Sequence, residues 1–157
     1  MATLHALHGL PGSGKTTFAR KLADELPAVR FTPDEWMIAL HGTNPAEALF
    51  REQHPRILAL IMEHARRVLA AGVDVILDIG FWTRASRDEI RQRAAEWNVT
   101  LKFYALDCPA AIARQRVQDR THRGGTDALV IDEAAFDQFL AQFEPMDSSE
   151  THLVVSN

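Results

Sequence analysis

Short apolar runs alternate along the chain with longer stretches in which apolar residues recur at helical spacing. Each apolar run that is flanked by turn residues predicts a buried strand. Because strands that alternate with helices pair in parallel, the pattern predicts an α/β fold with a five-stranded parallel sheet and helices on both faces. The predicted strands are Thr3–His8, Val29–Thr32, Val73–Ile79, Val99–Leu106 and Leu153–Val155.

The helical stretches have recognisable boundaries. Pro55 is expected to kink the longest helix or to begin a second one, and Gly72 ends it. Ser86 is expected to cap the helix after the third strand, while Thr32 and Asp34 are candidate caps of the short second helix. The predicted helices are Lys15–Leu26, Asp34–Leu40, Ala46–Ala71, Ser86–Trp97, Pro109–His122 and Asp132–Phe143.

The 157 residues are enough for one domain with a substantial core, and we expect a single domain over residues 1–157. The formal net charge of −4 argues mildly against non-specific binding to long nucleic acid. Cys108, the only cysteine, excludes an internal disulfide and suits a reducing compartment. Because the chain begins on a predicted strand and has no membrane-length apolar run, we expect a cytoplasmic protein without a signal peptide or membrane span.

The segment between the first strand and the first helix has the pattern G-x-x-x-x-G-K-[ST]. Such a loop aims backbone N–H groups at phosphate oxygens, and the following helix adds positive potential. Lys15 would reach the β- and γ-phosphates, and the Thr16 hydroxyl would ligate Mg²⁺. The residues expected to bind the nucleotide are Gly9, Pro11, Gly12, Ser13, Gly14, Lys15, Thr16, Thr17 and, from a later helix, Arg120.

The sequence also bears on the identity of the nucleotide and the metal. No Asn-Lys-x-Asp motif for reading guanine occurs, so ATP is the expected donor. The seven histidines follow no metal-binding spacing, which argues against zinc.

Two carboxylates follow predicted strands at the edge where ligands bind in such sheets. Asp78 ends an apolar strand and is expected to hold Mg²⁺, although it would also suit a cap of the next turn. Asp34 would accept the proton of an acceptor hydroxyl, or would merely interact with the dipole of its helix as a first-turn acid. Glu35 is a weaker candidate for the same base.

Arginines crowd the helix that begins after Pro109. Arg116 and Arg120 are four residues apart on one helical face, and Arg123 continues that stripe. They would stabilise the charge that spreads over a transferred phosphoryl group, with residues 114–130 closing as a lid at Gly124 and Gly125. The alternative is a solvated basic face paired with nearby acids, such as those at positions 119 and 133.

Further candidates follow Asp78 directly. Arg84 and Arg87 would grip an anionic acceptor or align phosphates, or they are surface charges at a helix start. Phe81 and Trp82, with the more distant Trp36, would form an aromatic wall for an acceptor, or they belong to the core.

With these residues together, the chain resembles the small P-loop kinases grouped with zeta toxins, chloramphenicol phosphotransferase and the kinase domain of polynucleotide kinases. GLPGSGKTT is specific to the superfamily, whereas TPDEW, VILDIGFWTRASRDE, RQRVQDR and FEP are similar to its AAA_33 branch. The resemblance covers nearly the whole chain and implies a P-loop NTPase fold, use of Mg-ATP and transfer to a hydroxyl. It implies that Asp34 is the general base and that Arg116 and Arg120 belong to the lid helix.

One departure bears on the acceptor. Polynucleotide kinases usually carry an arginine shortly after the base, whereas Glu35, Trp36 and Met37 stand here. Lysine and arginine are absent after Arg123, so the C-terminal segment offers no basic channel. We therefore expect an ATP-dependent phosphotransferase acting on a small-molecule hydroxyl, with a 5′-hydroxyl polynucleotide kinase and a nucleotide-binding switch as alternatives.

Overall fold

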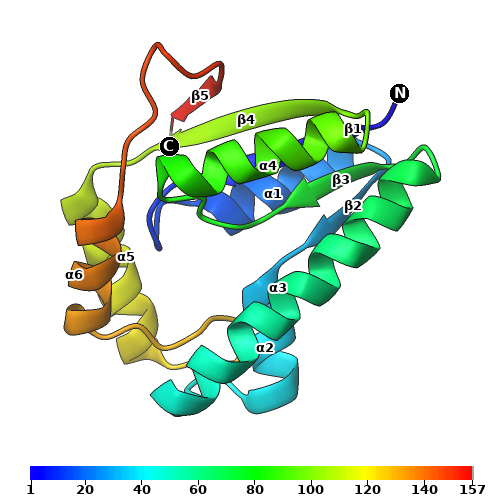
Figure 1. Ribbon diagram of the computed structural model, residues 1–157. Helices are drawn as coiled ribbons and strands as arrows, with labels where there is room; N and C mark the ends of the chain where they lie inside the picture. Colours follow the sequence, from blue (N-terminus) through cyan, green and yellow to red (C-terminus); the bar gives the residue numbers. More distant parts are fainter. Residues whose placement is uncertain (157) are drawn as a thin grey trace.

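The computed structural model describes residues 1–156 and contains one five-stranded sheet (Figure 1). The strand order is β2-β3-β1-β4-β5, and every neighbouring pair is parallel. β1 therefore lies in the middle, between β3 and β4. The strands are β1 (Thr3–His8), β2 (Ala28–Phe31), β3 (Asp74–Leu77), β4 (Thr100–Asp107) and β5 (Leu153–Ser156). The predicted α/β class and the five parallel strands are confirmed.

Helices cover both faces of the sheet, as the sequence predicts. α3 and α4 lie on one face and α1 on the other, while α5 and α6 pack together beyond the end of the sheet (Figure 1). Among residues 1–156, no helix is long and apolar enough to cross a bilayer. The helices are α1 (Lys15–Glu25), α2 (Pro33–His41), α3 (Glu47–Ala70), α4 (Arg84–Glu96), α5 (Ala110–Arg123) and α6 (Glu133–Gln142).

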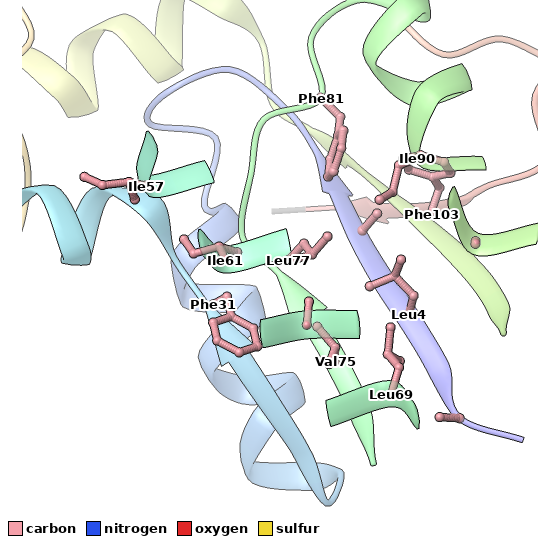
Figure 2. Close-up of a cluster of buried hydrophobic side chains, with 14 of the residues drawn as sticks. Leu4, Phe31, Ile57, Ile61, Leu69, Val75, Leu77, Phe81, Ile90 and Phe103 are labelled. Carbon is pink, nitrogen blue, oxygen red and sulfur yellow. The ribbon is translucent and has the colours of Figure 1, made fainter. Parts of the chain in front are cut away.

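The core explains why the strands are apolar on both sides. Leu4 and Ala6 of β1 face the cluster under α3 and α4, whereas Leu7 belongs to the cluster under α1. Figure 2 shows Ile57 and Ile61 of α3 in the larger cluster with strand residues of the sheet. Residues on both faces of a central parallel strand are removed from water, so the strand reads as a continuous hydrophobic run.

Two helix boundaries differ from the sequence prediction. Pro55 does not begin a second helix, since α3 continues through it, and Ile57, Ile61 and Ala65 of the following turns are buried against the sheet. The N-cap of α4 lies three residues earlier than expected. Thr83, not Ser86, is its N-cap, and the Thr83 side chain accepts a hydrogen bond from the Ser86 backbone N–H.

A buried ion pair joins the C-terminal segment to α4. The Arg87 guanidinium donates from Nε to Oε1 of Glu150 at 2.8 Å and from Nη2 to Oε2 at 2.9 Å. The two side chains are 1% and 2% exposed. Arg91 donates to the same carboxylate from the partly exposed side, at 2.6 Å. The arginines hold the pKa of Glu150 down at about 2, chiefly through the Arg87 hydrogen bonds.

This arrangement predicts that replacing Arg87 lowers the stability of the protein more than replacing Arg91 does. Arg87→Met leaves a buried carboxylate without its main partner, so it should lower the free energy of unfolding by about 3–5 kcal/mol. Arg91→Met should cost about 1 kcal/mol or less, because Arg91 is partly exposed and Glu150 keeps Arg87. Urea unfolding of both variants measures the difference, and equal losses would contradict the assignment.

Candidate active site

The loop from Gly9 to Gly14 joins β1 to α1 in a conformation that suits phosphate. Gly12 and Gly14 have φ of 80° and 93°, a region that side chains with a Cβ rarely adopt. Gly14 is the N-cap of α1, and no side chain caps the helix. Because the N-cap is a glycine, the positive end of the α1 dipole faces the loop, an arrangement that favours an anion.

Gly12 is also required by a neighbouring helix. A Cβ on Gly12 would lie 2.3 Å from the Ala113 carbonyl oxygen and 2.9 Å from Cγ2 of Val117. Ala113 and Val117 are buried in one cluster with Leu10 and Phe136 of α6. The first half of α5 is thus packed against the loop, so any closing motion of the predicted lid has to come from residues beyond Val117.

Lys15 is the first residue of α1, and its side chain turns back to the loop. Its Nζ donates a hydrogen bond to the Leu10 carbonyl at 2.8 Å. Burial lowers the pKa of Lys15 to about 8, while the carboxylates of Asp78 and Asp34 act in the opposite direction. A bound phosphate would favour the charged amine, in the same direction as the two carboxylates.

Asp78 and Thr16 meet at the carboxyl ends of β3 and β1. The Thr16 hydroxyl donates to Oδ2 of Asp78 at 2.7 Å, and the Thr32 hydroxyl donates to the same oxygen at 3.2 Å. Arg30 hydrogen-bonds the Thr32 hydroxyl and places Nη1 3.9 Å from Asp78 Oδ2. The sequence did not indicate that Thr32 and Arg30 contact Asp78. Arg30 lies in β2 and Thr32 directly follows it, and β2 neighbours β3 in the sheet.

The two oxygens of Thr16 and Asp78 suit Mg²⁺, which prefers hard oxygen ligands and takes only one or two from protein beside phosphates. Within residues 1–156, no group of three or more His, Cys, Asp or Glu side chains gathers as a metal site. When bound, the ion would neutralise charge on the β- and γ-phosphates.

Asp34 lies in the first turn of α2 and is open to solvent. Desolvation by the surrounding protein raises the pKa of Asp34, and Lys15, the strongest charged neighbour, lowers it. Asp78, His54 and Arg120 also act on this carboxylate electrostatically. Asp34 is therefore close enough to Lys15 for the charge of each to shift the pKa of the other. Glu35 points to other partners, since it accepts hydrogen bonds from Arg30 at 2.9 Å and Arg20 at 3.4 Å.

The two expected lid arginines lie at different depths. Arg116 places Nη1 3.5 Å from the Gly12 carbonyl oxygen, beside the loop. Arg120 acts electrostatically on both Lys15 and Asp34, and its buried Nε has no hydrogen-bond partner within residues 1–156. In the described part of the chain, neither Arg116 nor Arg120 forms an ion pair with an acid. The expected ion-paired basic face applies instead to Arg114, which pairs with Asp137 at 2.5 Å.

Arg120 also lines a cavity of about 150 Å³ under the segment that follows α5. The Val130 backbone N–H donates to the Thr43 carbonyl at 2.8 Å, so this segment reaches the loop between α2 and α3. The other residues around the cavity include Gly124, Gly125, Asp127 and Leu129.

Arg84 and Arg87 are not in the crevice, which corrects the expectation that they grip an acceptor. Arg87 is buried and its guanidinium is used by Glu150 and by the Phe81 and Trp82 carbonyls. Arg84 pairs on the surface with Asp88, at 3.1 Å. Their positive charges balance the acidic C-terminal segment instead of a ligand.

The expected aromatic wall is likewise absent from the crevice. Phe81 lies in the main core cluster, and Trp36 packs against the same cluster. Trp82 lies outside it and donates its indole N–H to the Gly9 carbonyl at 2.9 Å. Only Trp82 of the three therefore touches the phosphate loop.

The model of the AAA_33 family, an AAA domain, matches residues 4–146. The chain belongs to this family. No curated protein matches the sequence. The fold recurs in a protein of Chloroflexus aurantiacus J-10-fl with 17% identity and a TM-score of 0.79, covering 99% of this chain and 88% of that one.

Two further structures share the fold. A chain of the Pnkp1/Rnl/Hen1 RNA repair complex has 24% identity and a TM-score of 0.70 over 90% of this chain. This chain spans only 43% of the length of that protein. A sugar kinase of Janibacter sp. HTCC2649 has 23% identity and a TM-score of 0.67, covering 99% of this chain and 86% of that one. At these identities the AAA_33 domain shares the P-loop fold with them.

The lowered pKa of Lys15 predicts a pH dependence for nucleotide binding. Phosphate favours the charged amine, so binding raises the pKa above about 8 and takes up a proton at higher pH. The affinity for MgADP should therefore fall as pH rises from 8 to 9.5, by up to about tenfold per unit. Calorimetry in buffers of different ionisation enthalpy measures this uptake. Lys15→Arg should abolish the dependence, and its persistence there would exclude Lys15 as its source.

Proposed function

We propose that this AAA_33 domain transfers the γ-phosphate of Mg-ATP to a hydroxyl group of a small molecule. The observation that carries the proposal is the convergence of Lys15, Asp34 and Arg120 on one crevice, in which each acts electrostatically on another. Asp78 and Thr16 complete the arrangement from the adjacent strand ends.

The proposed step assigns one role to each group. The acceptor oxygen attacks the γ-phosphorus, the bond from that phosphorus to the bridging oxygen breaks, and ADP leaves. The acceptor proton passes to Asp34, whose raised pKa suits a base that must hold a proton briefly. Lys15 and Arg120 stabilise the charge on the transferred group, with Arg116 beside the loop.

A carboxylate facing the phosphates favours a transferase over a nucleotide-binding switch. A switch needs phosphate ligands and a metal but no base for an acceptor. Asp34 lies open to solvent within reach of the charge of Lys15, so an acceptor hydroxyl has access to it. Access of a hydroxyl to Asp34 therefore favours phosphoryl transfer over slow ATP hydrolysis as the main activity.

The names of similar structures support a small acceptor. They include a sugar kinase of Janibacter sp. HTCC2649 and a gluconokinase of Sinorhizobium meliloti 1021. The net charge of −4, and the use of Arg84 and Arg87 for internal pairs, leave little positive surface for a polyanion. The likeness to the RNA repair chain is the observation that favours the second candidate, a 5′-hydroxyl polynucleotide kinase.

The decisive experiment measures ADP release with a panel of small hydroxyl compounds and with a 5′-hydroxyl oligonucleotide. We expect a small acceptor to raise ADP release above the water background, with little effect of salt. An oligonucleotide acceptor would show steeply salt-dependent transfer, because binding it releases counterions. That result would replace our proposal by the polynucleotide kinase.

Asp34→Asn should lower transfer about 10²–10⁴-fold, because a general base is lost, while MgATP binding stays close to wild type. Glu35→Gln is the matched control, since Glu35 is adjacent but pairs with arginines. Asp78→Asn should instead weaken the Mg²⁺ dependence of binding. Transfer at the wild-type rate by folded Asp34→Asn protein would place the base elsewhere.

Arg120→Ala should lower the transfer rate more than the affinity for ATP, because the charge that it meets develops in the transition state. Arg123→Ala serves as the control, because Arg123 is exposed and its Nε donates to the Asp119 carbonyl of its own helix, at 3.4 Å. Steady-state kinetics of both variants separate kcat from KM. A purely KM effect in Arg120→Ala would assign Arg120 to nucleotide binding alone.

A further inference from the structure

The first residue of the phosphate loop is held on both sides by the loop between β3 and α4. The Gly9 backbone N–H donates to the Gly80 carbonyl at 3.2 Å. The Gly9 carbonyl accepts the indole N–H of Trp82 at 2.9 Å. Gly9 is buried, so Trp82 supplies a partner that water would not readily replace.

The backbone is shaped to let the indole approach. A Cβ on Gly80 would lie 2.0 Å from Nε1 of Trp82, so a side chain at position 80 would displace the ring. Trp82 is half-buried and belongs to none of the three apolar clusters within residues 1–156. Its ring is therefore placed by the loop contact and not by the demands of core packing.

The other contacts of Trp82 lead to the segment after the predicted lid. Its ring lies 4.5 Å from that of Phe139 in α6, centroid to centroid. Its carbonyl accepts the Glu144 backbone N–H at 2.8 Å. The Glu144 carboxylate in turn accepts the Arg84 N–H at the start of α4, at 2.9 Å. Trp82 thus stands between the phosphate loop and α6.

We propose that Trp82 is a positioning residue for nucleotide binding, which fixes the Gly9 peptide and couples the phosphate loop to α6. A phosphate loop binds because its N–H groups are already aimed inward, and the orientation of its first peptide sets that of the next ones. Without the indole donor, the Gly9 carbonyl loses this hydrogen bond, while the Gly9 N–H keeps its bond to the Gly80 carbonyl. The inference concerns the nucleotide alone and stands whether or not the acceptor is a small molecule.

The first test replaces two tryptophans in turn, one that donates to the phosphate loop and one that packs on the core. Trp82→Phe keeps an aromatic ring beside Phe139 but removes the donor to Gly9. Trp97→Phe is the matched control, because Trp97 packs on the core at the far end of α4. Calorimetry with MgADP should show affinity about 3- to 10-fold weaker in Trp82→Phe, the worth of one hydrogen bond, and unchanged in Trp97→Phe.

Urea unfolding of both variants separates this effect from loss of stability, since a purely structural tryptophan would lower stability without changing the affinity of the folded protein. Equal MgADP affinity in Trp82→Phe and Trp97→Phe would overturn the inference.

A second measurement keeps Trp82 and therefore does not depend on a variant that removes it. The chain has three tryptophans, so Trp36→Phe with Trp97→Phe leaves Trp82 as the sole indole fluorophore. Its emission should change on titration with MgADP and saturate with the calorimetric affinity. Adding Phe139→Leu should weaken MgADP binding, because the ring loses its support on α6. Unchanged emission at saturating MgADP would refute the coupling, even if the protein proved to be an active kinase.

Discussion

The hydrogen bond from the Thr16 hydroxyl to the Asp78 carboxylate joins the two halves of the crevice. One partner follows β1 and the other follows β3, and the bond exists because these strands are parallel neighbours in register, with Ala6 opposite Leu77. Every other group of the candidate site is arranged around this junction. The start of α2, which follows β2, adds Thr32 and Asp34 from one side, and α5 adds Arg116 and Arg120 from beyond the sheet.

The phosphate loop is supported from two sides that are far apart in sequence. Gly12 lies against Ala113 and Val117 of α5, and Gly9 is bonded to Gly80 and Trp82. A loop whose purpose is to present N–H groups loses affinity if it must first be ordered, so rigid support is a physical requirement. The support extends to the C-terminal segment, since Glu144 bonds both Trp82 and the first turn of α4.

The unevenly distributed charges of the chain form ion pairs with one another in the folded protein. Lysine and arginine residues are concentrated between Arg84 and Arg123, whereas the Asp, Glu, Lys and Arg positions after Arg123 are all acidic. Glu150 pairs with Arg87 and Arg91 of α4, and Asp137 pairs with Arg114 of α5. Opposite charges on α4, α5 and the C-terminal segment thus hold that segment against the domain. Arg120 differs, because its buried Nε has no hydrogen-bond partner within residues 1–156, and this is consistent with the role that we propose for it.

The sequence by itself determined the features that depend on near neighbours. Apolar periodicity predicted all five strands and six helices, and the glycine pattern predicted the loop at Gly9–Gly14, because both arise from local backbone preferences and burial. Tertiary structure decided the rest. The sequence suggested that Arg87 binds a ligand, whereas in the fold its guanidinium binds Glu150, 63 positions later. The sequence suggested that Trp82 lines an acceptor site, whereas in the fold its indole N–H donates to the carbonyl of Gly9, 73 positions earlier. Such partners are set by which strands are neighbours in the sheet and by where the chain returns, and spacing along the sequence carries no record of either.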